Sequence, residues 1–372
     1  MTSPVLREPR RSAAGYDRLS ENVAKLSTFV RGRGKKTTAP VDLMPVLLAL
    51  LKAVKAVVRY LTGTTELFRL CDRVLEDRRR GRLRIEGVAG PSGRSSGEPT
   101  SRVVGSLAPP AEGDLVERID RCLAYSTKLT SERKAMDSGT LDVDSVVQGI
   151  LVAKMFPKAG DPNTPQAKLF RECVDRIVET SQLINQLTAR AATKFESGDP
   201  DHVAQLFTLW DLALPTQPRP PRESELWLKL GFQGRDPATD FRGMGLLGLD
   251  NLVFFAQRHP RSMKRMLEIS HHPKAWFSLA IVGINMTSFA LHQLRKRRLY
   301  SLTTALSLGA TATAFAEFYS YLMDAFATTW AAHGEAVTVM DFPRVFKAFR
   351  KTVKKDLRAG RLLVLNTAAG LR

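Results

Sequence analysis

Residues 227–255 read WLKLGFQGRDPATDFRGMGLLGLDNLVFF, and this segment decides the fold. Five glycines lie between Gly231 and Gly248, and glycine permits backbone conformations and close approaches that other residues avoid. We therefore expect a structured loop first. Thr239 and Asp240 are residue types that cap helices, and a helix that ends before Pro260 follows. Its apolar positions recur at helical spacing, at Leu246, Leu249, Leu252 and Val253.

The same segment contains a G-x-G-x-x-G match from Gly243 to Gly248, with Glu268 about 20 residues further on. This pattern binds dinucleotides only when a buried strand precedes it inside a βαβ unit. Residues 236–242 do not form such a strand, since they read DPATDFR. The match therefore does not predict a dinucleotide site, and we expect no cofactor.

Apolar residues recur at helical spacing along most of the chain, and few runs alternate with period two. The sequence therefore predicts a mainly α protein, a single domain of about eight to ten packed helices. We expect helices over 41–84 with a break near Gly63, and over 115–129, 143–156, 167–194, 202–214, 276–294 and 341–355, the last capped by Asp341. Residues 302–333 are expected to form one long helix or a pair of helices.

Composition divides the chain into five parts. Residues 1–40 form a flexible basic arm, and 41–86 are amphipathic helices. A linker loop rich in Gly, Pro and Ser covers 87–113. Residues 114–356 hold the main helical domain, and 357–372 form a basic tail.

The net charge of +19 over 372 residues favours acidic partners, unless the basic ends are simply solvated tails. Lys52, Lys55 and Arg59 share one helical face and interrupt the apolar run at 43–61. A spanning helix is therefore not expected. The pattern fits a core-packed helix or one on an anionic membrane surface. Nucleic acid is not an expected partner, because no recognition motif is present.

The three cysteines, Cys71, Cys122 and Cys173, are far apart and have no metal-ligand spacing. We therefore expect no metal site and a reducing compartment. No signal peptide is visible, and acidic residues in the first 36 positions disfavour a transit peptide. The expected location is cytoplasmic, with peripheral association on an intracellular membrane as a further option.

The segment closely resembles the signature of the ELMO domain. The matching positions are Trp227, Gly231, Phe232, Gln233, Pro237, Thr239, Asp240, Phe241, Arg242, Gly243, Gly245, Leu249, Leu252 and Phe255. Phe254 departs from the pattern, where the family usually has Tyr. Residues 60–69, 277–286 and 340–345 resemble further segments of ELMO-domain-only proteins, so the likeness covers about 46–355 and makes 114–356 the ELMO domain.

The resemblance implies a function. ELMO-domain-only proteins are similar to activators of Arf and Arf-like GTPases, whereas the larger Rac-linked branch generally lacks an arginine at the position of Arg242. The resemblance thus implies that Arg242 enters a GTP-bound Arf-type GTPase in trans. Such an activator needs no nucleotide pocket, metal or base of its own, and the sequence shows no other catalytic constellation.

Alternatives remain open for the motif residues. Arg242 is either the inserted arginine or a buttress held by Asp240 or Asp236. Gln233 either contacts the partner or caps the loop, and Trp227 is expected to be a buried anchor. Pro237 and Thr239 are expected to shape the loop, while Gly243 and Gly245 clear the approach to Arg242. The alternative function is a non-catalytic adaptor that binds a small GTPase or its exchange factor at a membrane surface.

Overall fold

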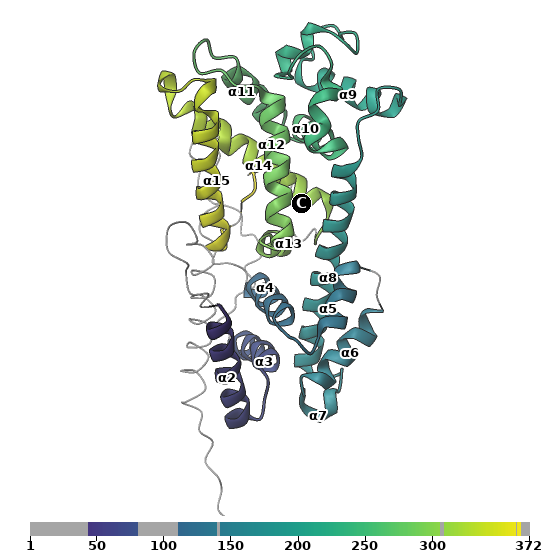
Figure 1. Ribbon diagram of the computed structural model, residues 1–372, viewed down its shortest axis with the longest axis vertical. Helices are drawn as coiled ribbons and strands as arrows, with labels where there is room; N and C mark the ends of the chain where they lie inside the picture. The colour runs from purple at the N-terminus through teal and green to yellow at the C-terminus, as the bar shows by residue number, and fades with distance from the viewer. Residues whose placement is uncertain (1–43, 81–110, 140–141, 306–308, 362, 366–372) are drawn as a thin grey trace, which may run out of the picture.

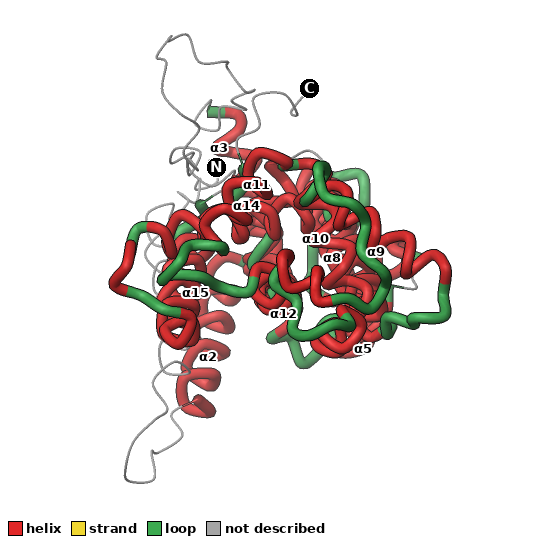
Figure 2. The backbone as a smooth tube through the Cα atoms, turned by 90° about the horizontal axis from the view of Figure 1, so that it is seen from above, coloured by secondary structure: helices red, strands yellow, loops and turns green. Residues whose placement is uncertain are grey.

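The computed structural model describes residues 44–80, 111–139, 142–305, 309–361 and 363–365. The predicted arm at 1–40, residues 87–110 of the linker and residues 366–372 lie outside this described part. Within it, every regular element is a helix, as predicted, and no strand occurs (Figure 2). Ten α-helices of nine residues or more lie between Ala111 and Arg358, in agreement with the expected eight to ten.

The helices follow one another in two groups joined by α8 (Figure 1). The first group is α2 (Met44–Thr62), α3 (Glu66–Arg79), α4 (Ala111–Ala124), α5 (Thr130–Ser138), α6 (Val143–Ala153) and α7 (Pro157–Gly160). After α8 (Pro165–Ala192) come α9 (Pro200–Ala213), η1 (Glu225–Leu230), η2 (Pro237–Gly243), α10 (Gly245–Arg258), α11 (Pro260–Ser270), α12 (Leu279–Arg295), α13 (Tyr300–Ala305), α14 (Ala312–Ala331), η3 (Gly334–Ala336), η4 (Val339–Asp341) and α15 (Phe342–Arg358).

Helix α8 is the long connector of the molecule. It starts at Pro165, where the Thr164 hydroxyl accepts a hydrogen bond from the Ala167 amide at 3.2 Å. Its 28 residues extend about 42 Å at 1.5 Å per residue. Buried residues up to Val178 belong to one hydrophobic core, and those from Leu183 onward belong to a second core. One continuous helix therefore joins two cores.

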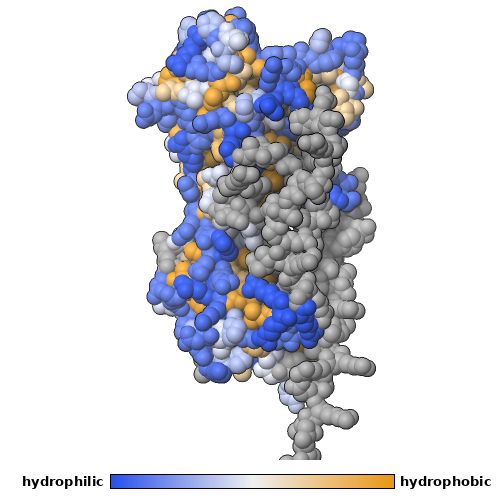
Figure 3. All heavy atoms as spheres, turned by 180° about the vertical axis from the view of Figure 1, so that it is seen from behind, coloured by the Kyte–Doolittle hydropathy of each residue, from blue (hydrophilic) through white to orange (hydrophobic). Residues whose placement is uncertain are grey.

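The first core defines an N-terminal lobe, made of α2–α7 and α8 up to Val178. Its buried side chains come from α3, α4, α5, α6 and α8, and Tyr300 of α13 completes it. The second core defines a C-terminal lobe, made of the rest of α8 with α9–α12, α14 and α15. Seen from behind, the described atoms form an upper and a lower mass with a narrower region between them (Figure 3).

Arg297 fastens the two lobes at the end of α12. Its guanidinium donates to Asp137 at 2.7 Å and to the Ser181 hydroxyl at 2.8 Å. It also lies 3.7 Å from the Asp120 carboxylate. The backbone of Arg297 is left-handed, with φ of 54°, a conformation that costs a non-glycine residue about 1 kcal/mol. These polar contacts hold the strained residue in place.

The C-terminal lobe is built around an aromatic centre in α14. Phe326 contacts Phe277, Trp330 and three phenylalanines of α15 at ring separations of 5.5–6.0 Å. Edge-to-face contacts of this kind add to the stabilisation from apolar burial. Helices α12 and α14 are therefore buried on most faces, as expected for the apolar stretches that form them.

The stretch 302–333 is a pair of helices, α13 and α14, which is one of the two predicted arrangements. The helix predicted over 115–129 is wrong at its end, because it stops at Ala124. Asp341 lies at the N-cap position of α15, as predicted, but its side chain makes no cap bond there; its carboxylate accepts from the Thr338 amide at 3.0 Å and closes the preceding short helix η4. A capping side chain satisfies whichever free amide lies nearest, so local spacing did not identify the helix.

No helix in the described ranges is both long and apolar enough to cross a membrane.

Candidate functional site

The aromatic residues of the motif segment are buried. Trp227 has no exposed surface, as expected of an anchor, and its indole N–H donates to the Arg222 carbonyl at 2.9 Å. The Trp227 ring meets Phe232, which in turn meets Phe241 at a centroid separation of 5.6 Å. Phe241 stacks on Phe195 beyond the end of α8. This row of rings ties η1 and η2 to the core.

Two glycines of the motif serve close backbone packing. Gly231 ends η1 with φ of 76°, and a Cβ there would lie 2.2 Å from the Leu279 amide nitrogen. Gly245 has φ of 49°, and a Cβ there would lie 2.2 Å from the Thr193 carbonyl oxygen. That carbonyl also accepts from the Leu246 amide at 2.9 Å. Gly245 is buried, so it packs the loop against α8 instead of clearing the approach to Arg242 as predicted.

Contrary to the prediction, Thr239 and Asp240 do not cap the helix that follows them, because α10 begins after Met244 without a side-chain cap bond. They lie instead inside η2, whose start is capped by Asp236. The Asp236 carboxylate accepts from the Ala238 amide at 3.0 Å and pairs with Arg222 at 3.0 Å. Pro237 is the first residue of η2 and is buried, a position where its fixed φ fits and no amide is needed. Thr239 is exposed, and its hydroxyl donates to the Asp236 carbonyl at 2.9 Å. Pro237 and Thr239 thus shape the loop as expected.

Asp240 holds the other side of the loop. Its carboxylate accepts from the Gln233 amide at 2.7 Å. Burial raises the pKa of Asp240, an effect opposed by this hydrogen bond and by the charge of Arg242. The backbone N–H of Gln233 closes the loop, whereas its carboxamide side chain is exposed and takes no part in that bond. The Gln233 side chain is therefore presented to solvent.

Arg242 projects from this braced loop. The residue is exposed, and its Nε donates to the Thr239 carbonyl at 2.7 Å. Among the described residues no carboxylate lies within 4.0 Å of its guanidinium, because Asp236 and Asp240 are engaged as above. The Nε contact fixes the stem of the side chain and leaves both terminal nitrogens without a protein acceptor in the described part of the chain.

Several exposed residues of the motif segment and of the segment before α12 were not singled out by the sequence. Arg235 is a second exposed arginine in the loop, and its carbonyl accepts from the Ser224 amide at 2.9 Å. Leu228 on η1 is 52 % exposed and Trp276 before α12 is 46 % exposed. A hydrogen bond of 2.9 Å from the His271 ring to the Lys229 carbonyl joins these two segments. Exposure of these side chains depends on packing and leaves no signal in the sequence.

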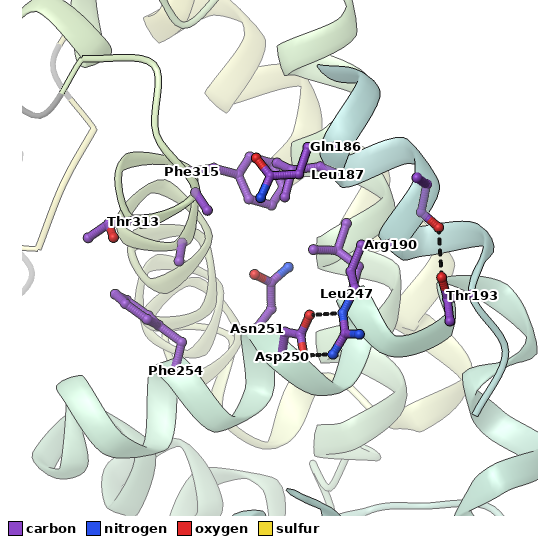
Figure 4. Close-up of a pocket in the computed structure, with 13 residues that line it drawn as sticks. Gln186, Leu187, Arg190, Thr193, Leu247, Asp250, Asn251, Phe254, Thr313 and Phe315 are labelled. Atoms are coloured by element: carbon purple, nitrogen blue, oxygen red, sulfur yellow. Dashed lines mark hydrogen bonds and ion pairs between the residues drawn. The ribbon is translucent and has the colours of Figure 1, made fainter. Parts of the chain in front are cut away.

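A separate cavity of about 500 Å³ lies between α8, α10 and α14 (Figure 4). Arg190 faces it but is neutralised by two hydrogen bonds to Asp250, at 2.6 and 2.8 Å. Phe254, where the ELMO pattern has Tyr, lines this cavity. None of the predicted site residues lines it, so it is distinct from the surface around Arg242.

Groups that could hold a metal ion are absent from the described residues, where no three His, Cys, Asp or Glu side chains cluster suitably. Burial is the main cause that raises the pKa of the Cys71 and Cys122 thiols to about 12. Both thiols are therefore protonated at neutral pH, and they are poor nucleophiles and poor metal ligands.

Comparison with known proteins identifies the class to which this helical fold and its motif loop belong. The model of the ELMO/CED-12 family matches residues 185–346. The human protein named ELMO domain-containing protein 2 is 33% identical over 259 residues, which cover 68% of this chain and 84% of that protein. Mouse ELMO domain-containing protein 1 is 35% identical over 262 residues, covering 64% of this chain and 79% of the relative.

A relative that matches over a shorter stretch is ELMO domain-containing protein B of Dictyostelium discoideum, 35% identical over 164 residues, or 44% of this chain and 56% of that protein. The chain therefore belongs to the ELMO/CED-12 family. The family match begins at residue 185, within α8, close to where the second core begins at Leu183. The C-terminal lobe is thus the part that the family model describes, while the predicted domain start at 114 lies in the other lobe.

Proposed function

We propose that this protein is a GTPase activator for an Arf or Arf-like small GTPase in its GTP-bound state, and that Arg242 acts in trans. Membership of the ELMO/CED-12 family supports the link to small GTPases in general. The observation that carries the proposal is the state of Arg242, which is exposed, held by its stem and free of a carboxylate partner among the described residues.

The chemistry requires such a group. GTP hydrolysis builds negative charge on the transferring phosphoryl group and on the leaving oxygen. A planar guanidinium offers parallel N–H donors that match phosphate oxygens. Supplied in trans, it accelerates hydrolysis by about 10³–10⁵. Because the Nε of Arg242 already bonds the Thr239 carbonyl, the remaining four N–H groups point outward with little side-chain freedom to lose.

The surroundings of Arg242 suit a partner interface. Gln233, Thr239 and Gly243 are exposed beside it. Leu228 and Trp276 add apolar surface on the adjoining segments. Interfaces commonly rest on a few exposed aromatic and arginine side chains at their centre. We infer that these residues contact the GTPase around the nucleotide, with Gln233 as a binding rather than a capping side chain.

Peripheral membrane association through α2 remains part of this proposal. Lys52 and Arg59 are exposed, in support of the predicted face. Lys55 lies 2.6 Å from Glu66 of α3, so its charge is largely compensated. The α2 contribution to lipid binding is therefore expected to come from two cations and not three.

Single-turnover hydrolysis of bound GTP, measured across a panel of Arf and Arf-like GTPases, tests the proposal. We expect stimulation by the wild-type protein and a loss of about 1,000-fold or more for Arg242→Ala. Arg242→Lys should fail as well, because an ammonium group lacks the bidentate fork. Arg235→Ala is the matched control, since it removes the other exposed arginine of the loop, and it should retain the rate.

The melting temperature separates catalysis from buttressing. The Arg242 side chain makes one exposed hydrogen bond to a neutral acceptor, so Arg242→Ala should cost no more than about 1 kcal/mol of stability. Full stimulation by Arg242→Ala on a folded protein would contradict the arginine mechanism. Nucleotide-dependent binding with unchanged hydrolysis for every GTPase tested would favour the adaptor instead.

A further inference from the structure

Two helices of the C-terminal lobe gather cations on one side of the molecule. The end of α12 and its continuation provide four of them, and the second half of α15 provides three. We call this surface the basic face, composed of His292, Arg295, Lys296, Arg298, Arg350, Lys354 and Arg358. The sequence pointed to α2 as the basic helix and did not bring these two segments together.

A contact between the two helices brings their cations together. The Lys354 ammonium of α15 lies 5.8 Å from the centre of the Phe289 ring of α12. Within α15, the Arg350 guanidinium lies 4.8 Å from the centre of the Phe346 ring. Figure 1 shows α12 and α15 running side by side. The stems of these two half-buried side chains therefore cover buried aromatic rings.

No described carboxylate forms an ion pair with the basic face, although the charge of Glu117 acts on Arg298 from further away. None of its seven side chains has a carboxylate within 4.0 Å in the described ranges. Arg295 donates to the Thr188 hydroxyl at 3.0 Å and Arg298 to the Gln293 side-chain oxygen at 3.0 Å, both neutral acceptors. Arg297 differs, because it is paired with Asp137. The carboxylate of α15, Asp356, bonds Arg361 instead.

The charged groups lie close enough to act on one another. Burial first, and then the neighbouring Arg350, Arg298 and Arg358, lower the pKa of Lys354. Burial and the charges of Lys296, Lys354, Arg298 and Arg295 lower the pKa of His292. Like charges in such proximity repel, and an anionic partner relieves the repulsion.

We propose that the basic face binds the anionic headgroups of a membrane surface. The cations are spread along two helices and do not converge on one pocket, so they match a surface of many phosphates more closely than a single ligand. Phe289, Phe346 and Phe349 are buried, and Phe342 is half-buried. These helices therefore offer no exposed Phe, Tyr or Trp ring among the described residues on which a base could stack, which disfavours single-stranded nucleic acid.

The position of the basic face agrees with the candidate site. Gly243, next to Arg242, lies against Ile284 of α12. Arg295 follows Ile284 by eleven residues, or three helical turns, so both lie on the same side of α12, about 16 Å apart. A membrane held at the basic face would therefore lie beside the motif loop. The binding itself requires neither a GTPase nor the activity proposed for Arg242.

Sedimentation with lipid vesicles tests the inference on the full chain. We expect binding to vesicles of phosphatidylcholine with 30 mol% phosphatidylserine, weaker binding at higher salt, and little binding to phosphatidylcholine alone. The variant Lys296→Glu/Lys354→Glu/Arg358→Glu should lower the partition coefficient by at least about 100-fold, since each basic side chain contributes about fivefold near an anionic surface and the new carboxylates are repelled by it. The milder Lys296→Gln/Lys354→Gln/Arg358→Gln serves if the reversed charges impair folding.

A matched variant removes the same charge elsewhere. Lys168, Arg261 and Lys264 are exposed and outside the basic face, so Lys168→Glu/Arg261→Glu/Lys264→Glu should bind vesicles nearly as the wild type does. Equal loss in both triple variants, or loss only on Lys52→Glu/Arg59→Glu, would overturn the assignment. Binding to a 30-base-pair DNA duplex that depends on the basic face, without vesicle binding, would also overturn it.

Discussion

The two lobes of this protein are both built of helices, but they differ in the composition of their cores and in the apolar side chains that they leave exposed. The C-terminal lobe has an aromatic core and carries a loop locked by Gly231 and Gly245 against other backbone. The N-terminal lobe has a mainly aliphatic core and leaves apolar side chains of α2 exposed, including Leu50 and Tyr60. The difference indicates that rigidity is concentrated where Arg242 must be held, whereas the other lobe keeps apolar surface accessible.

The glycine pair Gly245 and Gly139 gives the sharpest contrast between the lobes. Both have positive φ, but an added Cβ at Gly245 meets a backbone carbonyl at 2.2 Å, while at Gly139 it meets the flexible Gln182 side chain at 2.8 Å. Gly245→Ala should destabilise the protein by about 5 kcal/mol. Gly139→Ala should cost only about 1–2 kcal/mol. Urea denaturation measures both, and equal losses would refute the idea of a specially rigid loop.

Core truncation distinguishes stability from activity. Trp227→Ala in the C-terminal lobe and Phe170→Ala in the N-terminal lobe each remove a fully buried ring and should cost about 4 kcal/mol. Trp227 supports η1 and the row of rings beneath Arg242, so the folded fraction of Trp227→Ala should also lose GTPase stimulation. Stimulation per folded molecule should survive in Phe170→Ala. Equal specific activities of the two variants would show that the loop does not depend on this anchor.

Arg297 tests whether the lobes unfold together. Arg297→Ala removes the contacts to Asp137 and Ser181 across the lobe boundary, and should cost about 1–3 kcal/mol. We expect the melting transition to broaden or split in calorimetry, since α8 remains the main covalent and packed connection. Arg298→Ala is the neighbouring control, because the Arg298 side chain bonds Gln293 of α12 and, among the described residues, no side chain of the N-terminal lobe. A single sharp transition in Arg297→Ala would show that α8 alone couples the lobes.

Asp240 gives the smallest expected effect. Burial raises its pKa in the folded protein, so the folded state holds a proton more tightly than the unfolded state. Stability therefore falls as pH rises from the unfolded pKa through the folded pKa, and stays lower above it. Asp240→Asn should raise stability at pH 7 by under about 1 kcal/mol and change it little at pH 3. Thermal melts at both pH values measure this, and a loss at pH 7 would show that the charge itself braces Arg242.

Much of the fold was accessible from the sequence because helical periodicity is local. The break at Gly63, the long helix that became α8 and the stop before Pro260 all follow from residues within a few positions. The ends were less predictable. Asp341 and Asp240 each had a suitable capping chemistry, but their carboxylates bond the amides of Thr338 and Gln233, which the folded chain brings within reach.

The sequence by itself determined a helical protein of the ELMO/CED-12 family and the loop on which Arg242 lies. Only the tertiary structure decided which motif residues are buried and which carboxylates are hydrogen-bonded. It decided as well that Arg242 projects from the loop with no carboxylate partner among the described residues. It also placed the division between the two cores inside one helix and joined residues 292–298 with 350–358 in the basic face. Spacing along the chain fixes the turn of a helix, whereas burial and charge environment depend on segments that meet only after folding.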